Sequence, residues 1–132
     1  MELHHFGIAV KSISKSVDIY RVLGYQPESE LIYDESRNIN ILFMKNEVTR
    51  IELIEKSDSQ LPSPIDTVLD KRSFHCIYHT CYSVQNLEQE ISRLRKFNFV
   101  LVQEPAKAIA LGERQVCFLF HTNIGIIELL EK

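Results

Sequence analysis

One sequence pattern occurs twice in this chain, and the duplication constrains the fold more than any other feature. Residues 5–10, HFGIAV, are matched by residues 79–84, HTCYSV, which lie 74 positions further along. Each half also closes on nearly the same six letters, IELIEK at residues 51–56 and IELLEK at residues 127–132, at an offset of 76. Two copies of a pattern predict a domain of paired modules rather than a long repeat array.

Length and composition fit a single globular domain. The chain has 132 residues, of which 45% are hydrophobic and 25% are charged, and a domain of this size buries a core without disulfide bonds. The formal net charge of −3 and the pI near 5.9 argue against nucleic acid or an anionic membrane as a partner, because both select a basic surface. The sequence after Met1 has neither a secretory-signal pattern nor an apolar run of membrane-spanning length. We therefore expect no nucleic-acid partner and no membrane partner.

An odd number of cysteines without a CxxC spacing indicates free thiols in a reducing cytoplasm. The three cysteines are Cys76, Cys81 and Cys117, and free cysteines are usually buried and unreactive. Strand alternation places Cys81 on the same face as His79. We expect a cytoplasmic protein whose thiols mainly fill the core.

The first module, residues 1–56, has the pattern of a β-α-β-β-β unit. An alternating strand ends near Val10, and a helix follows with Ser12 as its N-cap and Gly24 as the left-handed residue after its end. Strand-like runs separated by turn-prone residues then occur at 26–33, 39–45 and 48–55.

A linker, residues 57–74, leads to the second module, residues 75–132, which repeats the order of the first. A strand is expected through residues 76–84, and a helix capped by Asn86 follows, with Asn98 in the place of Gly24. Further strands are expected at 99–103, 114–120 and 125–131, with a mobile-looking segment at 106–113. The two modules together are expected to form one domain, residues 1–132.

Two histidines and two glutamates occupy equivalent places in the modules. His5 and His79 lie in the opening strands, and Glu52 and Glu128 lie in the closing strands, facing away from the leucines beside them. A single histidine at a strand start is more often a surface or hydrogen-bonded residue. Here all four residues keep register in both copies and lie in apolar runs, where an unpaired charge is costly. Two imidazoles and two carboxylates suit one divalent metal ion, either zinc, nickel, cobalt, manganese or iron, with positions left for water or substrate.

The repeated module resembles the vicinal oxygen chelate superfamily, which includes glyoxalase I and methylmalonyl-CoA epimerase. The resemblance covers the whole chain and rests on residues 5–10, on IYRVLGY at residues 19–25 and on IELLE at residues 127–131. It is nearest to the epimerase branch in TRIEL at residues 49–53, followed by SPI at residues 63–65. The resemblance implies an α+β fold in which two tandem β-α-β-β-β modules form one metal-binding cleft with their curled sheets.

The resemblance also implies a site and a reaction. Carried over position by position, the metal ligands of the superfamily fall on His5, Glu52, His79 and Glu128. The implied activity is that of a metal-dependent lyase or isomerase, of the glyoxalase or methylmalonyl-CoA epimerase type, in which Glu128 also moves a proton next to a carbonyl or thioester. Epimerases of this type carry a further catalytic carboxylate on the third strand of the first module, and residues 39–43, INILF, have none. The expected partners are a small carbonyl or thioester substrate and a second copy of the chain in a homodimer.

Two other kinds of function stay open from the sequence. A binding protein of the same fold, such as an antibiotic-sequestering resistance protein, holds an intact ligand without metal and gives no reason to keep four ligand-type residues. A metal-dependent dioxygenase or a thiol transferase would more naturally use two histidines and one carboxylate. Glu52 therefore distinguishes the four-ligand enzyme from these last two classes.

Overall fold

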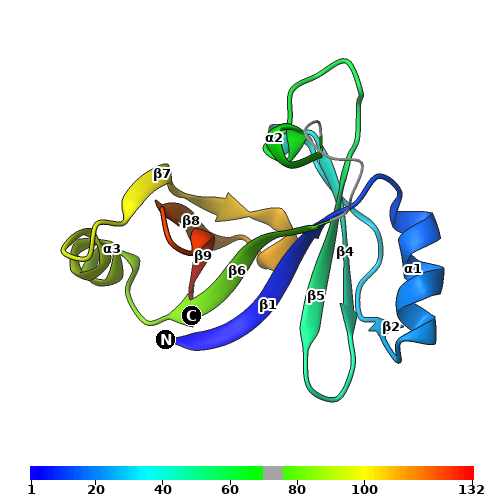
Figure 1. Cartoon of the computed structure of the whole chain (residues 1–132), viewed down its shortest axis with the longest axis horizontal. Coiled ribbons are helices and arrows are strands. Elements are labelled where there is room, and N and C mark those ends of the chain that lie inside the picture. Colours follow the sequence, from blue (N-terminus) through cyan, green and yellow to red (C-terminus); the bar gives the residue numbers. More distant parts are fainter. Residues whose placement is uncertain (70–75) are drawn as a thin grey trace. The chain divides into compact units, whose positions relative to one another are not determined.

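The protein has an α+β fold in which each half of the chain supplies strands and one longer helix. The computed structural model describes residues 1–69 and 76–132, without the side chain of Cys76 (Figure 1). The expectations for that thiol, for linker residues 70–74 and for His75 at the start of the second module lie outside the described residues. The chain divides into two compact units, residues 5–78 and residues 1–4 with 79–132.

The unit of residues 5–78 contains a mixed sheet built around one hairpin. The elements are β1 (Glu2–Ala9), which enters this unit at His5, then α1 (Ile13–Val22), β2 (Gln26–Pro27), β3 (Ile32–Asp34), β4 (Ile39–Lys45), β5 (Arg50–Lys56) and the short α2 (Asp66–Leu69). β4 pairs antiparallel with β2, β3 and β5, and β5 pairs parallel with β1.

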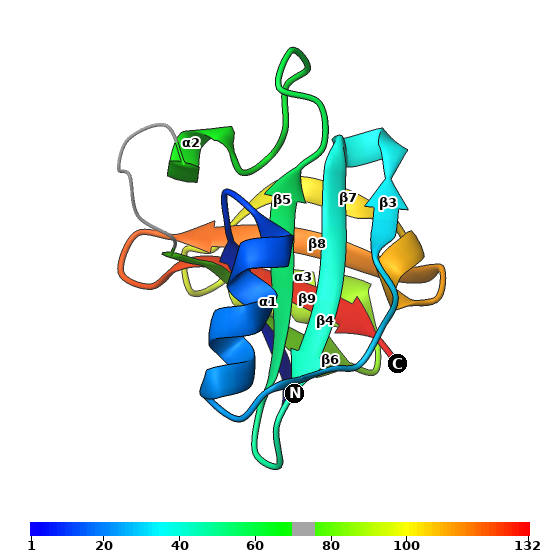
Figure 2. The same ribbon diagram turned by 90° about the vertical axis from the view of Figure 1, so that its right-hand side faces the viewer.

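Local signals fix both ends of α1. The Ser12 side chain accepts a hydrogen bond from the Lys15 backbone N–H at 3.4 Å, and Gly24 follows the helix with a φ of +89°, a conformation that glycine adopts at little cost. Figure 2 shows α1 running alongside β5, and the two elements are in contact. The apolar cluster beneath the helix consists of Ile8, Val10, Ile13, Met44, Ile51 and Leu53.

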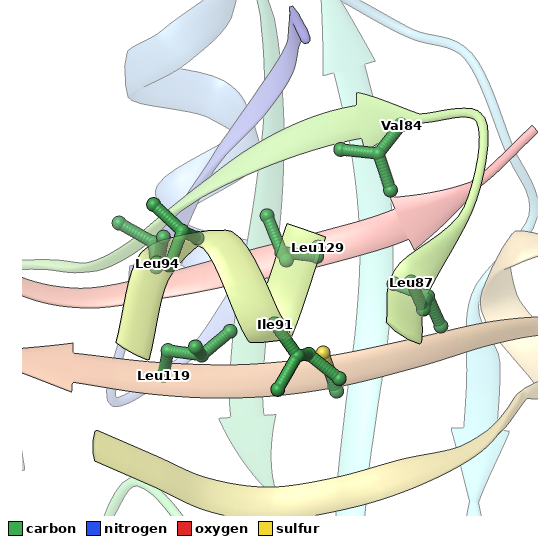
Figure 3. Packing of buried hydrophobic residues seen from close by; sticks show 8 residues of the cluster. Val84, Leu87, Ile91, Leu94, Leu119 and Leu129 are labelled. Carbon is green, nitrogen blue, oxygen red and sulfur yellow. The ribbon is translucent and has the colours of Figure 1, made fainter. Parts of the chain in front are cut away.

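The second unit repeats this plan with its own strands and helix. The elements are β6 (Cys76–Val84), which enters this unit at His79, then α3 (Leu87–Arg95), β7 (Val100–Ala108), β8 (Arg114–His121) and β9 (Gly125–Glu131). β9 pairs parallel with β6 and antiparallel with β8, and β8 pairs antiparallel with β7. In Figure 3, Leu87, Ile91 and Leu94 of α3 lie against Leu119 of β8 and Leu129 of β9.

The expected helix signals of the second module are confirmed. Asn86 caps α3 by accepting the Gln89 backbone N–H at 2.8 Å. Asn98 follows the helix with a φ of 65°, so it takes the left-handed conformation that Gly24 takes in the first module. Asparagine tolerates this conformation better than most residues other than glycine.

The closing strands also cap the helices, which explains part of the repeated hexapeptide. In the first unit, Glu55 Oε1 accepts the Ile13 backbone N–H at 3.2 Å. In the second unit, Glu131 Oε1 accepts the Leu87 backbone N–H at 3.2 Å. Each carboxylate satisfies a backbone donor at a helix start and lies at the positive end of the helix dipole.

The duplication extends to a short turn that the strand patterns did not reveal. A 3-10 turn, η1 (Glu35–Arg37), is followed by Asn38 with a φ of 55°, and another, η2 (Ile109–Leu111), is followed by Gly112 with a φ of 71°. Both pairs keep the offset of 74. Only the asparagine has a second role, because its Nδ2 donates to the carbonyl oxygens of Asp58 and Leu61 at 2.9 and 3.0 Å.

The strand expected over residues 26–33 is interrupted. It forms the short β2 and β3, and the residues between them bind β4 by other contacts. The Glu28 backbone N–H donates to the Phe43 carbonyl at 2.8 Å, and the Phe43 N–H donates to Ser29 Oγ at 3.0 Å. A side chain thus replaces one backbone acceptor, and Pro27 has no N–H to continue a ladder.

In the second unit, the strand and the mobile segment expected within residues 99–113 need correction. β7 continues to Ala108, so the predicted strand was too short and the predicted mobile segment was wrong for residues 106–108. Pro105 is accommodated because the pairing of β7 with β8 shifts register between Leu101 and Gln103 and between Gln103 and Ala106. Such irregularities are the usual place for proline in a sheet.

The expectation that the cysteines fill the core is confirmed for Cys81 and Cys117, whose thiols are fully buried. Within residues 1–69 and 76–132, no helix combines the length and the apolar content that a membrane crossing requires.

Candidate functional site

In the first unit, two neighbouring parallel strands bring a histidine and a glutamate together. Gly7 of β1 lies opposite Glu52 of β5, and His5 is two residues before Gly7, so His5 and Glu52 face the same side of the sheet. The distance from His5 Nε2 to Glu52 Oε2 is 3.3 Å. His5 is 1% exposed and Glu52 is 6% exposed, so both polar groups are removed from water.

The second unit repeats this geometry with its own residues. Cys81 of β6 lies opposite Glu128 of β9, and His79 is two residues before Cys81. The distance from His79 Nε2 to Glu128 Oε2 is again 3.3 Å, and these residues are 3% and 4% exposed. The structure therefore brings the four predicted residues together as two equivalent pairs, one in each unit.

Because both pairs are buried, each carboxylate needs a partner that stabilises its charge. A carboxylate removed from water is costly unless it binds a cation or hydrogen-bond donors. An imidazole at 3.3 Å supplies one such partner in each pair. Imidazole nitrogen and carboxylate oxygen are also common protein ligands of divalent transition metals. The donor chemistry of both pairs thus fits a metal ion as well as a simple ion pair.

Each pair has an aromatic neighbour that the sequence analysis missed. The ring of Phe43 in β4 meets the His5 ring edge-on, with centroids 5.4 Å apart and an interplanar angle of 80°. Phe118 of β8 meets the His79 ring in the same way, at 5.3 Å and 81°. The two phenylalanines are 75 positions apart, an offset between the 74 and 76 of the flanking strands. Aligning the third and fourth strands of the modules would have revealed them.

The buried thiols near the second pair are suited to packing rather than to reaction. Burial is the main cause that raises the pKa of Cys117 to about 12, and the charges of Glu128 and Glu104 add to it. The thiolate is the reactive form of cysteine, so Cys117 stays protonated and inert at neutral pH. Cys81 shares the face of His79, as expected, and has no exposed surface.

A surface groove in the same unit lies away from the histidine and glutamate. It has a volume of about 530 Å³, and its walls include Arg95 of α3 and Glu104 of β7. Two other lining residues connect the groove to the apolar cluster beneath α3, because Ile91 belongs to that cluster and Leu101 packs against it. The groove is therefore on the helix side of the sheet, whereas Glu128 faces the other side.

Comparison with known families decides between the superfamily and other α+β folds. The sequence model of the glyoxalase/bleomycin resistance protein/dioxygenase superfamily matches residues 4–118. The chain belongs to this superfamily. The matched residues include three of the four residues of the two pairs, and the expectation drawn from the duplicated motifs is confirmed.

Several similar proteins within the superfamily are named methylmalonyl-CoA epimerase. The mitochondrial methylmalonyl-CoA epimerase of Dictyostelium discoideum is 27% identical over 133 residues, covering 99% of this chain and 78% of that protein. The methylmalonyl-CoA epimerase of Mycobacterium tuberculosis has a solved structure with a TM-score of 0.81 and 26% identity, covering 98% of this chain and 87% of that one. The Streptomyces coelicolor methylmalonyl-CoA epimerase, solved with 2-nitronate-propionyl-CoA, has a TM-score of 0.82 at 15% identity, covering 100% of this chain and 97% of that one. The last likeness is one of fold.

Proposed function

We propose that the protein is a metal-dependent isomerase of the methylmalonyl-CoA epimerase type, which moves the proton on the carbon next to a thioester carbonyl. The observation that carries the proposal is the buried histidine–glutamate pair, present with the same 3.3 Å distance in both units. The names of the relatives favour this isomerase over a glyoxalase-type lyase. The substrate class is accordingly an acyl-CoA thioester with an acidic carbon.

The proposed metal ligands are His5, Glu52, His79 and Glu128, which together hold one divalent ion. Zinc, nickel, cobalt, manganese and iron all accept this set of nitrogen and oxygen donors. When bound, the ion polarises the carbonyl oxygen of the substrate and stabilises the negative charge that develops there as the proton leaves. The burial of all four side chains keeps bulk water from competing with the substrate oxygen for the same electrostatic interaction.

Glu128 is the proposed proton shuttle. Its carboxylate is almost fully buried, and a carboxylate held in place beside a substrate carbon is a common general base. General bases of this kind contribute about 10²- to 10⁴-fold to a rate. A carboxylate oxygen of Glu128, whose Oε2 lies 3.3 Å from His79 Nε2, takes the proton from the substrate carbon.

One departure from the epimerases that the chain resembles bears on stereochemistry. β4 has no acidic residue, and the residue opposite Glu52 on this strand is Phe43. A single carboxylate that removes and returns the proton on one face exchanges it without inverting the carbon. Proton exchange and inversion therefore need to be measured separately.

The experiment incubates the protein with methylmalonyl-CoA in deuterium oxide. Deuterium at the acidic carbon is followed by mass spectrometry, and inversion is followed with a coupling enzyme that accepts one epimer only. We expect Glu128→Gln to lower the exchange rate at least 100-fold, while the metal content, measured by plasma mass spectrometry, falls much less. Glu52→Gln is the matched variant, for which metal content and exchange should fall together.

Three outcomes would contradict the proposal. Equal losses of metal and exchange in Glu128→Gln would make this residue a ligand only. Unchanged metal affinity and activity in Glu52→Ala would favour a three-ligand dioxygenase or thiol transferase. A protein that binds none of the five metals would point to a binding protein that holds an intact ligand.

The compartment and the assembly follow as parts of the same proposal. Two buried cysteines that keep their thiols, Cys81 and Cys117, support a reducing cytoplasm. A homodimer is the assembly that the superfamily resemblance implies. Light scattering during gel filtration tests the dimer directly. The protein is measured below and above about 10 μM, because many protein associations have affinities on the order of micromolar.

A further inference from the structure

The two units share one feature that the proposed ligands do not explain. In each unit a phenylalanine meets the ligand histidine edge-on, and the two contacts agree within 0.1 Å in centroid distance, 5.4 and 5.3 Å, and within one degree in angle, 80° and 81°. The residues involved are Phe43 with His5 and Phe118 with His79. Two modules that have diverged at most positions have kept this contact.

The strand register shows how the contact is built. Phe43 is the direct partner of Glu52 in the β4–β5 ladder, and Phe118 is the direct partner of Glu128 in the β8–β9 ladder. Cross-strand partners have side chains on the same face, a few ångströms apart. Each unit therefore presents phenylalanine, glutamate and histidine side by side from three adjacent strands.

The two rings lie outside the apolar clusters beneath α1 and α3, although Phe43 itself is buried at 6% exposure. The clusters take the alternate residues of the same strands, Met44 of β4 and Leu119 of β8. Both phenylalanines thus lie on the face of the histidine and glutamate, opposite the helix.

We infer that Phe43 and Phe118 are positioning residues that fix the ring orientation of His5 and His79 for metal binding. The inference rests on the proposed function. The outer torsion of histidine is broad and has no sharp preferred angle, so a neighbouring contact must select the orientation that turns Nε2 toward the carboxylate. An edge-to-face ring contact has this directionality, and phenylalanine offers no polar atom to compete for the metal.

The test measures cobalt(II) affinity and the visible cobalt spectrum of Phe43→Leu, Phe118→Leu and the double variant. Neighbours that orient metal ligands typically change metal affinity about 10- to 100-fold. We expect each single variant to lose about tenfold in affinity, with altered band positions, and the double variant to lose close to the product of the two. Phe118→Tyr keeps the ring and should keep the affinity within about twofold.

Matched controls come from the next residue of each strand. Met44→Leu and Leu119→Met alter the helix-side packing of the same strands and should leave cobalt affinity unchanged. Thermal unfolding of the metal-free proteins identifies any variant that does not fold, and in that case Phe43→Met or Phe118→Met, which keep bulk without a ring, replace the leucine variants.

The outcomes separate the inference from the proposed function. Leucine variants that bind cobalt as tightly and with the same spectrum as the controls overturn the positioning role while leaving the metal site intact. A wild-type protein that binds no cobalt overturns the proposed function, and the inference falls with it. A loss of affinity confined to the ring-free variants supports the inference.

Discussion

Asp34 is a buried carboxylate whose charge is supported by a local network. It is 2% exposed and accepts hydrogen bonds from Ser36 Oγ and Arg37 Nη1, both at 2.6 Å. Burial by itself would raise the pKa of Asp34, but the hydrogen bonds from Ser36 and Arg37 and the Arg37 charge outweigh it, so the pKa is lowered. A carboxylate with a lowered pKa stabilises the fold above the pKa of the unfolded chain, about 3.9, and this contribution is lost as the pH falls through the folded-state pKa.

Replacing Asp34 with asparagine should therefore destabilise the protein in a pH-dependent way. We expect Asp34→Asn to lower the free energy of unfolding at pH 7 by about 1.5–3 kcal/mol, the range for a hydrogen bond to a charged group. The difference from the wild type should shrink below about pH 4, where the unfolded-state carboxyl binds its proton. Urea unfolding between pH 7 and about pH 3 measures both quantities.

Asp18→Asn is the matched control for this prediction. Asp18 also pairs with an arginine three residues later, but the pair is 3.4 Å apart and its side chains are 51% and 76% exposed. Exposed pairs contribute little, so this variant should behave as the wild type at every pH. A stability difference for Asp34→Asn that is as large at pH 3 as at pH 7 would show that charge is not the cause.

At the scale of secondary-structure elements, the closing strand of each module caps the helix of the same module. Glu55 and Glu131 accept the first helical N–H groups of α1 and α3, both at 3.2 Å. We expect Glu55→Ala and Glu131→Ala each to lower the free energy of unfolding by about 1 kcal/mol, the usual cost of losing a helix cap. Urea unfolding at neutral pH measures the loss.

Glutamine variants separate hydrogen bonding from charge in this cap. Glu131→Gln keeps an oxygen acceptor and loses only the favourable interaction with the helix dipole, so it should cost less than Glu131→Ala. If both alanine variants are as stable as the wild type, then the repeated glutamate at the end of the hexapeptide has another cause.

The sequence predicted elements well where hydrophobic alternation was unbroken. The bounds expected for residues 39–45 and 125–131 are those of β4 and β9. Prediction failed where a side chain replaced a backbone partner, as at Ser29, whose hydroxyl accepts the Phe43 N–H. It also failed where a strand passed a proline, as β7 does at Pro105. Neither event leaves a periodic signal.

The sequence pointed to the histidines and glutamates of the candidate site but not to the residues around them. Both glutamates and both histidines could be found because identical letters recur at a nearly fixed offset, and the structure brings each pair within 3.3 Å. Phe43 and Phe118 were missed because they lie in runs of apolar residues, where the sequence does not distinguish a phenylalanine beside the site from an ordinary core residue. Only the register of β4 with β5 and of β8 with β9 places them beside the glutamates.

At the scale of the whole molecule, the boundaries of the two compact units fall inside strands. One boundary lies between His4 and His5 in β1, and the other lies between Tyr78 and His79 in β6. Domain boundaries normally fall in exposed linkers that few contacts cross. A boundary inside a strand means that unfolding one unit must break into an element that the other unit also uses. We therefore propose that residues 1–132 unfold as one cooperative domain.

Hydrogen exchange of two core variants tests this cooperativity. Leu119 is fully buried in the second unit and Leu53 is fully buried in the first, so Leu119→Ala and Leu53→Ala should each cost about 2–5 kcal/mol. In a single cooperative domain, Leu119→Ala lowers the protection of β4 and β5 by the same free energy as that of β8 and β9. Leu53→Ala likewise lowers the protection of β8 and β9 by the same free energy as that of β4 and β5. If each variant changed protection only in its own unit, the modules would be separate folding units, because local opening then has its own free energy.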